Sequence, residues 1–369
     1  MSRRIALAGG GTAGHVFPLL AVAAAYRARR PDVELLFIGA VGGDECRLAE
    51  AAGLACAALP AAPLFGVGPL GQLRAAWRVL RGRRAARALL AARGIELILG
   101  SGGYVSAAPL LAARQLGLAT AILEPNVAPG LTNRLLGRLV ERVYLCSAAA
   151  RARFPAARTL VTGVPVRPEL TARAPADPGH PPRVLITGGS GGSAFLNRAA
   201  PPLLAALRDR VGEVAVWHQS GGGDAAAVRA AYAAHGLPAR VEPFIDAMAA
   251  AYAWADVGVA AAGAVTCAEL AAVGLPALVV PLSTASEDHQ TANARAFAAA
   301  GHGRWVAEAD WERAALADWL ASATGARPAR GAVGDDAGRA IVDDCEALLA
   351  TRLITTKTPR HQADQDFRS

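Results

Sequence analysis

Two segments of this sequence share one order of features: a short apolar run, a glycine-rich turn and an amphipathic stretch. The first begins Ile5-Ala-Leu-Ala-Gly-Gly-Gly-Thr-Ala-Gly-His15, and the second begins Val184-Leu-Ile-Thr-Gly-Gly-Ser-Gly-Gly192. This order is typical of a parallel strand that turns sharply into a helix. Because it occurs twice in 369 residues, a chain too long for one core, we expect two α/β domains of similar design.

The other apolar runs also favour parallel sheets, because they are continuous rather than alternating, as in strands covered on both faces. The expected strands are Ile5–Ala8, Leu35–Ile38, Leu97–Leu99, Thr120–Leu123, Val143–Cys146, Val184–Thr187, Val214–Trp217, Val257–Ala260 and Ala277–Val280. Amphipathic stretches at Val16–Arg29, Phe195–Arg208 and Gln290–Ala300 lie between them. The predicted fold class is therefore α/β, with ligands bound beyond the carboxyl ends of the strands.

A proline-rich stretch separates the two halves. Pro165 and Pro168 are followed by four more prolines in residues 174–182. We therefore expect a first domain over residues 1–163 and a second over residues 164–335, facing each other across a cleft. The polar end of the chain, residues 351–369, has no apolar period, and we expect it to be a disordered tail.

Charge and cysteine content narrow the function classes. A net charge of +8 favours an anionic partner, either a phosphate, a nucleic acid or an acidic membrane. Aromatic residues make up only 5% of the chain and no nucleic-acid motif is present, which argues against nucleic acid.

The five cysteines form no C-x-x-C pair and are scattered, which argues against a zinc knuckle or disulfide framework and favours a reducing compartment. No secretory signal and no uncharged apolar run of ~18 residues is visible, so we expect no transmembrane helix.

The first glycine turn matches the dinucleotide pattern G-x-G-x-x-G, but no acidic residue ends the second expected strand, as an NAD site would require. An ATP-binding loop is also excluded, because His15 follows Gly14 where a lysine would be needed. A glycine turn before a helix still brings backbone N–H groups close to phosphate. His15 at the helix start is either a general base near neutral pH or a structural histidine.

The second glycine turn, residues 188–192, matches the G-x-S-x-G nucleophile elbow, so a serine hydrolase with Asp256 and His289 is one hypothesis. The other is a second phosphate cradle, in which Ser190 donates to a pyrophosphate oxygen.

Further polar residues follow the later strands. Glu269 falls in the first turn of an expected helix, where it either caps the helix or accepts hydrogen bonds from a ribose diol. Gln290 and Asn293 share one helix face and either read sugar hydroxyls or are solvated.

Residues 51–95 contain no acidic residue and many arginines. Leu70, Leu73, Trp77 and Leu80 follow helical spacing, with basic residues beside them. A basic amphipathic helix with a tryptophan suits an anionic membrane surface, and a core-facing helix with a solvated basic face is the alternative. The predicted membrane-contact residues are Leu73, Arg74, Trp77, Arg78, Leu80 and Arg81.

Taken together, these segments resemble the MurG family, the UDP-N-acetylglucosamine transferases of peptidoglycan synthesis. The resemblance is carried, in family order, by Gly10–Pro18, Gly102–Ser106, Glu124–Asn126, Gly130–Asn133, Thr162–Arg167, Gly188–Ser190, Trp217–Ser220, Phe244–Met248, Gly263–Glu269, Gly274–Pro276 and Asp288–Asn293. It implies a GT-B fold, two Rossmann-like domains with the acceptor bound mainly by the first and UDP-GlcNAc mainly by the second. A last helix over about 336–350 would cross back to the first domain.

The implied reaction is the inverting transfer of GlcNAc from UDP-GlcNAc to the 4-hydroxyl of undecaprenyl-pyrophosphoryl-MurNAc-pentapeptide, lipid I to lipid II. It would need no cofactor and no metal, and would occur peripherally at the cytoplasmic face of the cell (inner) membrane. Cell-wall synthesis proteins are candidate partners. A GT-B transferase with a different acceptor remains the alternative.

The resemblance also implies a role for each matching residue. His15 would take the proton from the muramyl 4-hydroxyl. On the sugar and pyrophosphate side, the substrate-binding residues would be Thr12, Ala13 and Gly14, with Asn126 at the sugar and Arg167 and Ser190 on the pyrophosphate. Phe244 and the backbone of Ile245 would hold uracil, while the nucleotide would be surrounded by Ala264, Val265, Thr266, Cys267, Ala268 and Glu269, with Glu269 on the ribose diol. Gln290 and Asn293 would bind the GlcNAc hydroxyls. Ala13, Val164, Gly191 and Ala261-Ala262 depart from the family pattern, which bears on donor affinity rather than on reaction type.

Overall fold

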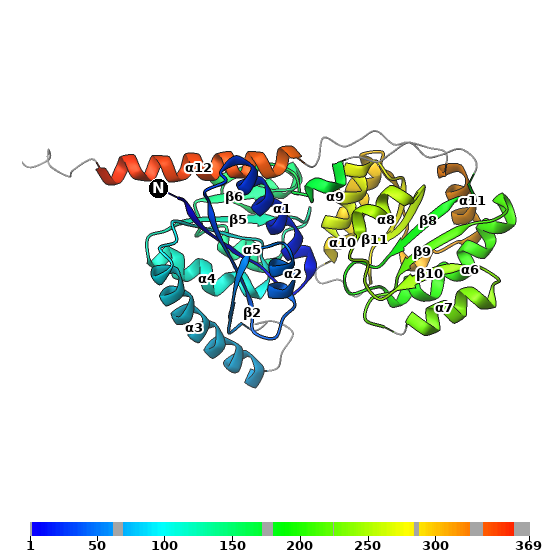
Figure 1. The fold of residues 1–369 in the computed structure, drawn as a ribbon, viewed down its shortest axis with the longest axis horizontal. Coiled ribbons are helices and arrows are strands. Elements are labelled where there is room, and N and C mark those ends of the chain that lie inside the picture. The colour runs from blue at the N-terminus through cyan, green and yellow to red at the C-terminus, as the bar shows by residue number, and fades with distance from the viewer. Residues whose placement is uncertain are drawn as a thin grey trace, which may run out of the picture.

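The computed structural model describes residues 2–61, 69–171, 180–223, 225–283, 288–324 and 335–357. Two parallel sheets form two lobes that lie side by side, each with helices on both faces (Figure 1). The first lobe is blue to cyan in Figure 1, and the second is green to orange. The predicted α/β class with two sheets is therefore confirmed.

The first sheet has seven strands in the order β3-β2-β1-β4-β5-β6-β7, and all of its pairings are parallel. Its strands are β1 (Arg4–Ala8), β2 (Glu34–Ala40), β3 (Ala55–Leu59), β4 (Leu97–Gly100), β5 (Ala119–Glu124), β6 (Arg142–Leu145) and β7 (Thr159–Val161). The helices between them are α1 (Ala13–Arg29), α2 (Glu45–Ala51), α3 (Pro69–Ala92), α4 (Gly103–Gln115) and α5 (Leu131–Leu136). Ile5, Leu7 and Leu97 are fully buried, which explains their unbroken apolar pattern.

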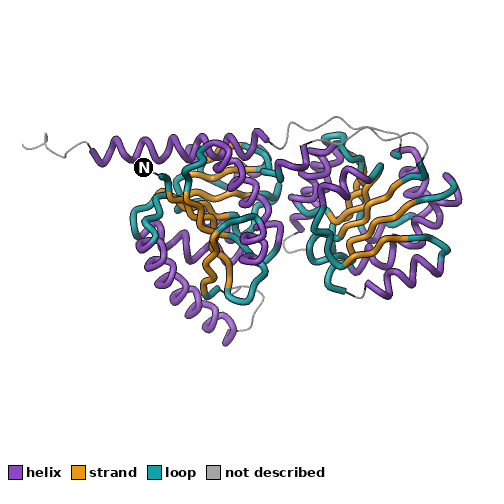
Figure 2. Tube along the Cα trace, in the orientation of Figure 1, coloured by secondary structure: helices purple, strands orange, loops and turns teal. Residues whose placement is uncertain are grey.

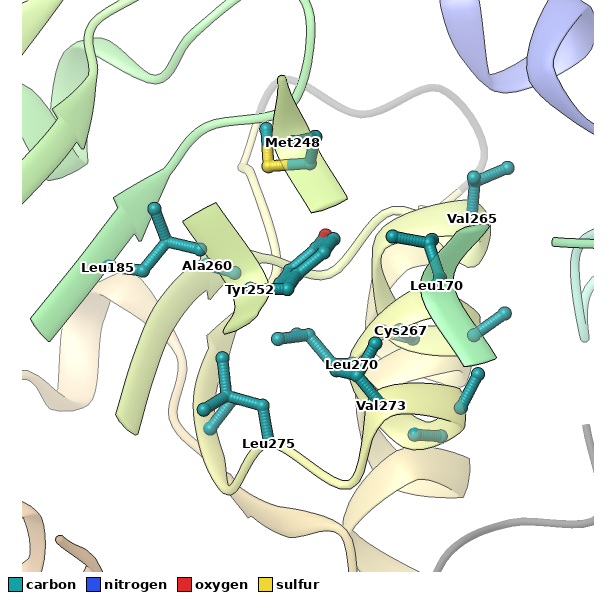
Figure 3. Packing of buried hydrophobic residues seen from close by; sticks show 14 of the residues in the cluster. Leu170, Leu185, Met248, Tyr252, Ala260, Val265, Cys267, Leu270, Val273 and Leu275 are labelled. Carbon is teal, nitrogen blue, oxygen red and sulfur yellow. The ribbon is translucent and has the colours of Figure 1, made fainter. Parts of the chain in front are cut away.

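The second sheet has six parallel strands in the order β10-β9-β8-β11-β12-β13. Its strands are β8 (Arg183–Thr187), β9 (Ala215–Gln219), β10 (Ala239–Glu242), β11 (Val257–Ala261), β12 (Ala277–Val280) and β13 (Gly303–Trp305). Its helices are α6 (Ala194–Val211), α7 (Ala225–Ala234), α8 (Met248–Trp254), α9 (Ala264–Val273), α10 (His289–Ala299) and α11 (Arg313–Ala323). Figure 3 shows one face of its core, where Tyr252 lies among apolar side chains of α8, α9 and the strands.

The last helix, α12 (Asp335–Lys357), lies along the first lobe although it follows the second in sequence (Figures 1 and 2). Ile341 and Cys345 are fully buried in the first core, and the Tyr144 hydroxyl donates to Asp344 at 2.9 Å. The helix continues beyond residue 350. Residues 351–357 are therefore helical, which corrects the expectation that a disordered tail begins at residue 351. Arg352 explains part of this extension, because its guanidinium donates to Glu141 on the first lobe. Residues 358–369 lie outside the described residues.

The cysteines correct one expectation. Cys46 in α2 and Cys56 in β3 form a disulfide, whereas the scattered spacing argued against any such pairing. The crossover from β2 through α2 to β3 brings the two residues together, and sequence spacing does not reveal this approach. Cys146, Cys267 and Cys345 are free thiols.

Candidate active site

A cavity of about 790 Å³ opens between the two lobes. It is lined by the turns that follow β1 and β5 of the first sheet and β8 and β11 of the second. These turns lie at the carboxyl ends of parallel strands, where α/β sheets bind their ligands. The predicted site residues that line it are Thr12, Ala13, Gly14, His15, Asn126, Arg167, Ser190, Phe244, Ile245, Ala264, Val265, Thr266, Glu269 and Gln290.

His15 lies in the first turn of α1 and lines the cavity. Its Nδ1 lies 2.8 Å from the carbonyl oxygen of Ser101, at the end of β4. A carbonyl oxygen can only accept, so Nδ1 carries the proton of the neutral ring, and Nε2 keeps its lone pair. The fold therefore holds the imidazole as the tautomer that can accept a proton at Nε2.

The surroundings of His15 also favour its neutral form. Burial lowers the pKa of His15 below its ordinary value, and nearby His289 lowers this pKa further, while the hydrogen bond to Ser101 opposes the shift. A lowered pKa keeps the imidazole unprotonated at neutral pH. The second lobe contributes to this environment, because His289 begins α10.

Arg167 and Glu269 are paired with each other. The guanidinium of Arg167 donates to Oε1 of Glu269 from Nε at 3.1 Å and from a terminal nitrogen at 2.9 Å. Tyr252 donates to Oε2 of the same carboxylate at 3.0 Å. The Arg167 guanidinium also lies 4.7 Å from the ring centre of Phe17 in α1. The Arg167 guanidinium is thus held at the cavity wall between the two lobes. Arg167, expected at the pyrophosphate, and Glu269, expected at the ribose, are direct neighbours.

Glu269 is buried, with 5% of its surface exposed. Burial raises the pKa of its carboxyl group above the usual value, and Arg167 and the Tyr252 hydroxyl oppose this rise. Oε1 of Glu269 already accepts two hydrogen bonds and Oε2 accepts one, so Oε2 keeps one acceptor site for a diol hydroxyl.

The second glycine turn presents Ser190 at the cavity, exposed and just beyond β8. The side-chain amide of Gln219 donates to the Gly189 carbonyl at 2.7 Å and holds the turn in place. The hydrolase alternative fails here, because Asp256 accepts from the backbone N–H of Arg183, the first residue of β8. Asp256 therefore lies at the opposite end of the strand from Ser190, and the proposed triad is not assembled.

Two further predicted contacts are constrained by existing hydrogen bonds. The backbone N–H of Ile245 donates to Oε1 of Gln219 at 2.9 Å, which leaves the carbonyl of Ile245 as its backbone group for a base. Oε1 of Gln290 accepts from the N–H of Leu282 at 3.0 Å. Cys267 and Ala268 do not line the cavity, because they point into the core of the second lobe.

Asn293 is also placed away from the cavity wall, where it joins the two lobes. It is 3% exposed, its Oδ1 accepts from the N–H of Val127 at 3.0 Å, and its Nδ2 donates to Asn126 at 3.2 Å. In this structure its amide is therefore used by protein groups rather than presented to a sugar.

Glu124, which was not among the predicted site residues, organises the neighbouring loop. Its oxygens accept from the backbone and side chain of Asn126, from the Gly130 N–H and from the side chain of Asn133, at 2.9–3.2 Å. Burial raises the pKa of Glu124, and these hydrogen bonds oppose the rise. The position of Glu124 at the end of β5 could have identified it, and Gln219 has the same signal at the end of β9. Tyr252 carries no such signal, because it occurs within the alanine-rich helix α8.

Helix α3 presents part of the predicted membrane face. Trp77 is 57% exposed and Leu80 is 51% exposed, while the Arg81 guanidinium lies 4.5 Å from the Trp77 ring centre. The core-facing alternative does not hold for these two side chains, since Ala86 and Leu90 make the core contacts of this helix. The side chains of Leu73 and Arg74 lie outside the described residues.

Two negative findings concern the described ranges only. No helix in them is both long and apolar enough to cross a membrane. Nor do three or more histidine, cysteine, aspartate or glutamate side chains gather there as a set of metal ligands.

Comparison with known proteins agrees with this arrangement. Residues 5–145 match the glycosyltransferase family 28 N-terminal domain, and residues 183–327 match the family 28 C-terminal domain. A UDP-N-acetylglucosamine–N-acetylmuramyl-(pentapeptide) pyrophosphoryl-undecaprenol N-acetylglucosamine transferase of Nitratidesulfovibrio vulgaris (strain DSM 19637 / Miyazaki F) is 40% identical, over 95% of this chain and 98% of its own. The transferase of the same name from Geobacter sp. (strain M21) is 36% identical, over 98% of both chains.

Solved structures agree with the fold. The crystal structure of Acinetobacter baumannii MurG has a TM-score of 0.70 and 28% identity, covering 94% of this chain and 99% of that one. A calicheamicin glycosyltransferase has a TM-score of 0.63 at 16% identity, covering 95% of this chain and 99% of that one, and shows the fold alone. The lobes and the cavity between them thus define a GT-B glycosyltransferase. With relatives this similar over nearly their whole length, the chain belongs to the MurG family of N-acetylglucosamine transferases.

Proposed function

We propose that this chain transfers N-acetylglucosamine from UDP-GlcNAc to the 4-hydroxyl of undecaprenyl-pyrophosphoryl-MurNAc-pentapeptide, converting lipid I to lipid II. The observation that carries the proposal is 40% identity over 95% of the chain to a transferase named for these two substrates. The cavity supports it, because the histidine, the arginine and both glycine turns of the sequence pattern lie at one site.

The second lobe would hold the donor nucleotide. Phe244 and the carbonyl of Ile245 suit a uracil base, and Glu269 lies at the cavity wall where a ribose would follow. The N-terminus of α9 and the Arg167 guanidinium suit the negative charge that grows on UDP as it leaves. In this proposal Arg167 shifts from Glu269 toward the pyrophosphate when the donor binds.

The chemistry is a direct displacement. Nε2 of His15 accepts the proton of the muramyl 4-hydroxyl, and that oxygen forms a bond to the anomeric carbon of GlcNAc. The bond from that carbon to the UDP oxygen breaks, and its electron pair leaves with UDP. Attack from the face opposite the leaving group inverts the anomeric centre and gives a β-1,4 link. The Ser101 carbonyl stabilises the imidazolium that forms, through its hydrogen bond to Nδ1.

The acceptor is anchored in a membrane, so the enzyme must reach it from the membrane surface. Trp77 and Leu80 would enter the interface at the cytoplasmic face, while Arg78 and Arg81 would contact anionic headgroups. This is a peripheral mode of binding.

The test is a direct transfer assay. Purified protein is incubated with UDP-GlcNAc and a short-chain lipid-linked muramyl pentapeptide, and UDP and disaccharide-lipid are both measured. The proposal predicts that one disaccharide-lipid forms for each UDP released. Transfer to a different acceptor but none to this one would overturn the proposal.

A further inference from the structure

A buried carboxylate lies directly beneath the first glycine turn. Glu45 is the first residue of α2 and is 5% exposed. Its Oε1 accepts from the backbone N–H of Gly11 at 2.8 Å, four residues before His15 in sequence. Its Oε2 is buried and has no hydrogen-bond partner among the described residues. Burying a carboxylate that is only partly satisfied is costly, which suggests a role beyond stability.

The surrounding backbone is shaped to this side chain. A Cβ added at Gly10 would lie 2.3 Å from Oε1 of Glu45, and one at Gly43 would lie 1.9 Å from Oε2. A Cβ at Gly39 would lie 2.9 Å from the Cβ of Glu45. Gly10 and Gly43 therefore approach the carboxylate, and Gly39 of β2 approaches its Cβ, so closely that a side chain at any of the three would require Glu45 to shift.

The glycine turn needs an external constraint. Residues 9–11 are three consecutive glycines, which have more backbone freedom than any other residues, and Gly11 adopts a positive φ of 86°. The Thr12 side chain makes no capping hydrogen bond at the start of α1. The contact with Glu45 therefore supplies an orientation that the turn cannot supply for itself.

The helix that carries Glu45 is itself fixed to the first sheet. The next residue, Cys46, is joined by the disulfide to Cys56 in β3, and Ala49 is fully buried in the core. The hydrogen bond from Gly11 to Glu45 thus fixes the glycine turn, and His15 after it, relative to the first sheet.

We propose that Glu45 is a positioning residue, which orients the Gly11 peptide so that the turn and His15 face the acceptor. This inference rests on the proposed function. The inference predicts that the side chain at position 45 must place an acceptor oxygen where Oε1 now lies, and that this oxygen need not carry a charge. A misplacement of about 1 Å in a catalytic group can lower the rate about 100-fold, so a small shift of this turn is enough to matter.

The test compares Glu45→Gln, Glu45→Asp and Glu45→Ala with the wild type and with Glu50→Ala, a control at an exposed position of the same helix. We measure kcat, KM for each substrate, and UDP binding, which depends on the second lobe and also reports folding. Gln keeps the acceptor at the same reach, so its kcat should stay within about threefold of wild type. Asp is one methylene shorter, so its kcat should fall about tenfold or more, with UDP binding unchanged.

The outcomes separate the inference from the proposed function. Equal kcat values for Glu45→Asp, Glu45→Gln and the wild type would overturn the positioning role while leaving the proposed function intact. Equal losses of kcat and of UDP binding in Glu45→Asp would also overturn it, because they indicate a purely structural role. No transfer by the wild type would overturn the proposed function and this inference together. If Glu45→Ala does not fold, the Gln and Asp variants still decide the outcome.

Discussion

At the residue scale, pairings between side chains set the properties of the candidate site. Glu269 has Arg167 on one oxygen and Tyr252 on the other, and Asn126 is held by Glu124 and Asn293. The sequence pattern identified several of these residues singly. It did not reveal the pairs Arg167–Glu269 and Asn126–Asn293, because their members lie 102 and 167 residues apart in sequence and meet only in the folded chain.

The hydroxyl of Tyr252 should matter for donor binding. Tyr252→Phe removes the hydrogen bond to Oε2 of Glu269 and leaves its packing in place. Losing such a bond costs about 1 kcal/mol, so KM for UDP-GlcNAc should rise about fivefold with little change in kcat. Tyr232→Phe is the control, because that hydroxyl contacts His218 in the core and not the cavity. Equal effects of the two variants would contradict a role in donor binding.

A second residue, His218, should make stability depend on pH. Burial between the Tyr232 hydroxyl and Asn197 lowers the pKa of His218 from 6.5 to about 4. Between these values the unfolded chain binds a proton that the native state does not, so the free energy of unfolding falls as pH falls. From pH 7 to pH 4.5 this group should remove about 2–3 kcal/mol.

Urea unfolding at the two pH values measures this loss. His218→Gln should show a smaller loss between pH 7 and pH 4.5 than the wild type, while substitution of the exposed His235 should leave the loss unchanged. An identical pH dependence for His218→Gln and the wild type would show that this prediction is wrong.

At the element scale, the interior of each sheet could be predicted from sequence and the edges could not. All nine expected strands are present, with ends that differ by at most two residues. The four strands that sequence analysis missed, β3, β7, β10 and β13, are the edge strands of the two sheets. Edge strands have neighbours on one side only and need fewer apolar residues, so short segments such as Gly303–Trp305 give little signal.

Helix α3 is the element whose function is most open to a direct test. Replacing Trp77, Arg78 and Arg81 with alanine should weaken binding to anionic liposomes about tenfold or more, because each basic residue near such a surface contributes about 1 kcal/mol. Alanine at Arg304 and Arg313 removes the same charge from exposed positions of the second lobe and serves as the control. Equal binding by both variants, or no loss in the first, would contradict a membrane role for α3.

At the scale of the whole molecule, the cavity exists only because the lobes face each other. Arg167 stacks on Phe17 of the first lobe, and Asn293 of the second lobe bonds to Asn126 and Val127 of the first. The glycine turns, His15 and Glu269 could be assigned to strand ends from sequence alone. The crossing of α12 back to the first lobe was implied only by family resemblance, because its sequence does not indicate which lobe it covers.

The central claim is that the imidazole of His15 takes a proton from an incoming alcohol at this cavity. The most direct test is the pH dependence of kcat/KM for the wild type and for His15→Gln in the lipid-acceptor assay. Loss of a general base should lower kcat about 100-fold or more, with UDP binding unchanged. Because burial lowers the pKa of His15, the wild type should stay active down to a pH below 6.5 and lose activity as the ring protonates. A His15→Gln variant with wild-type kcat and the same acid limb would contradict the claim.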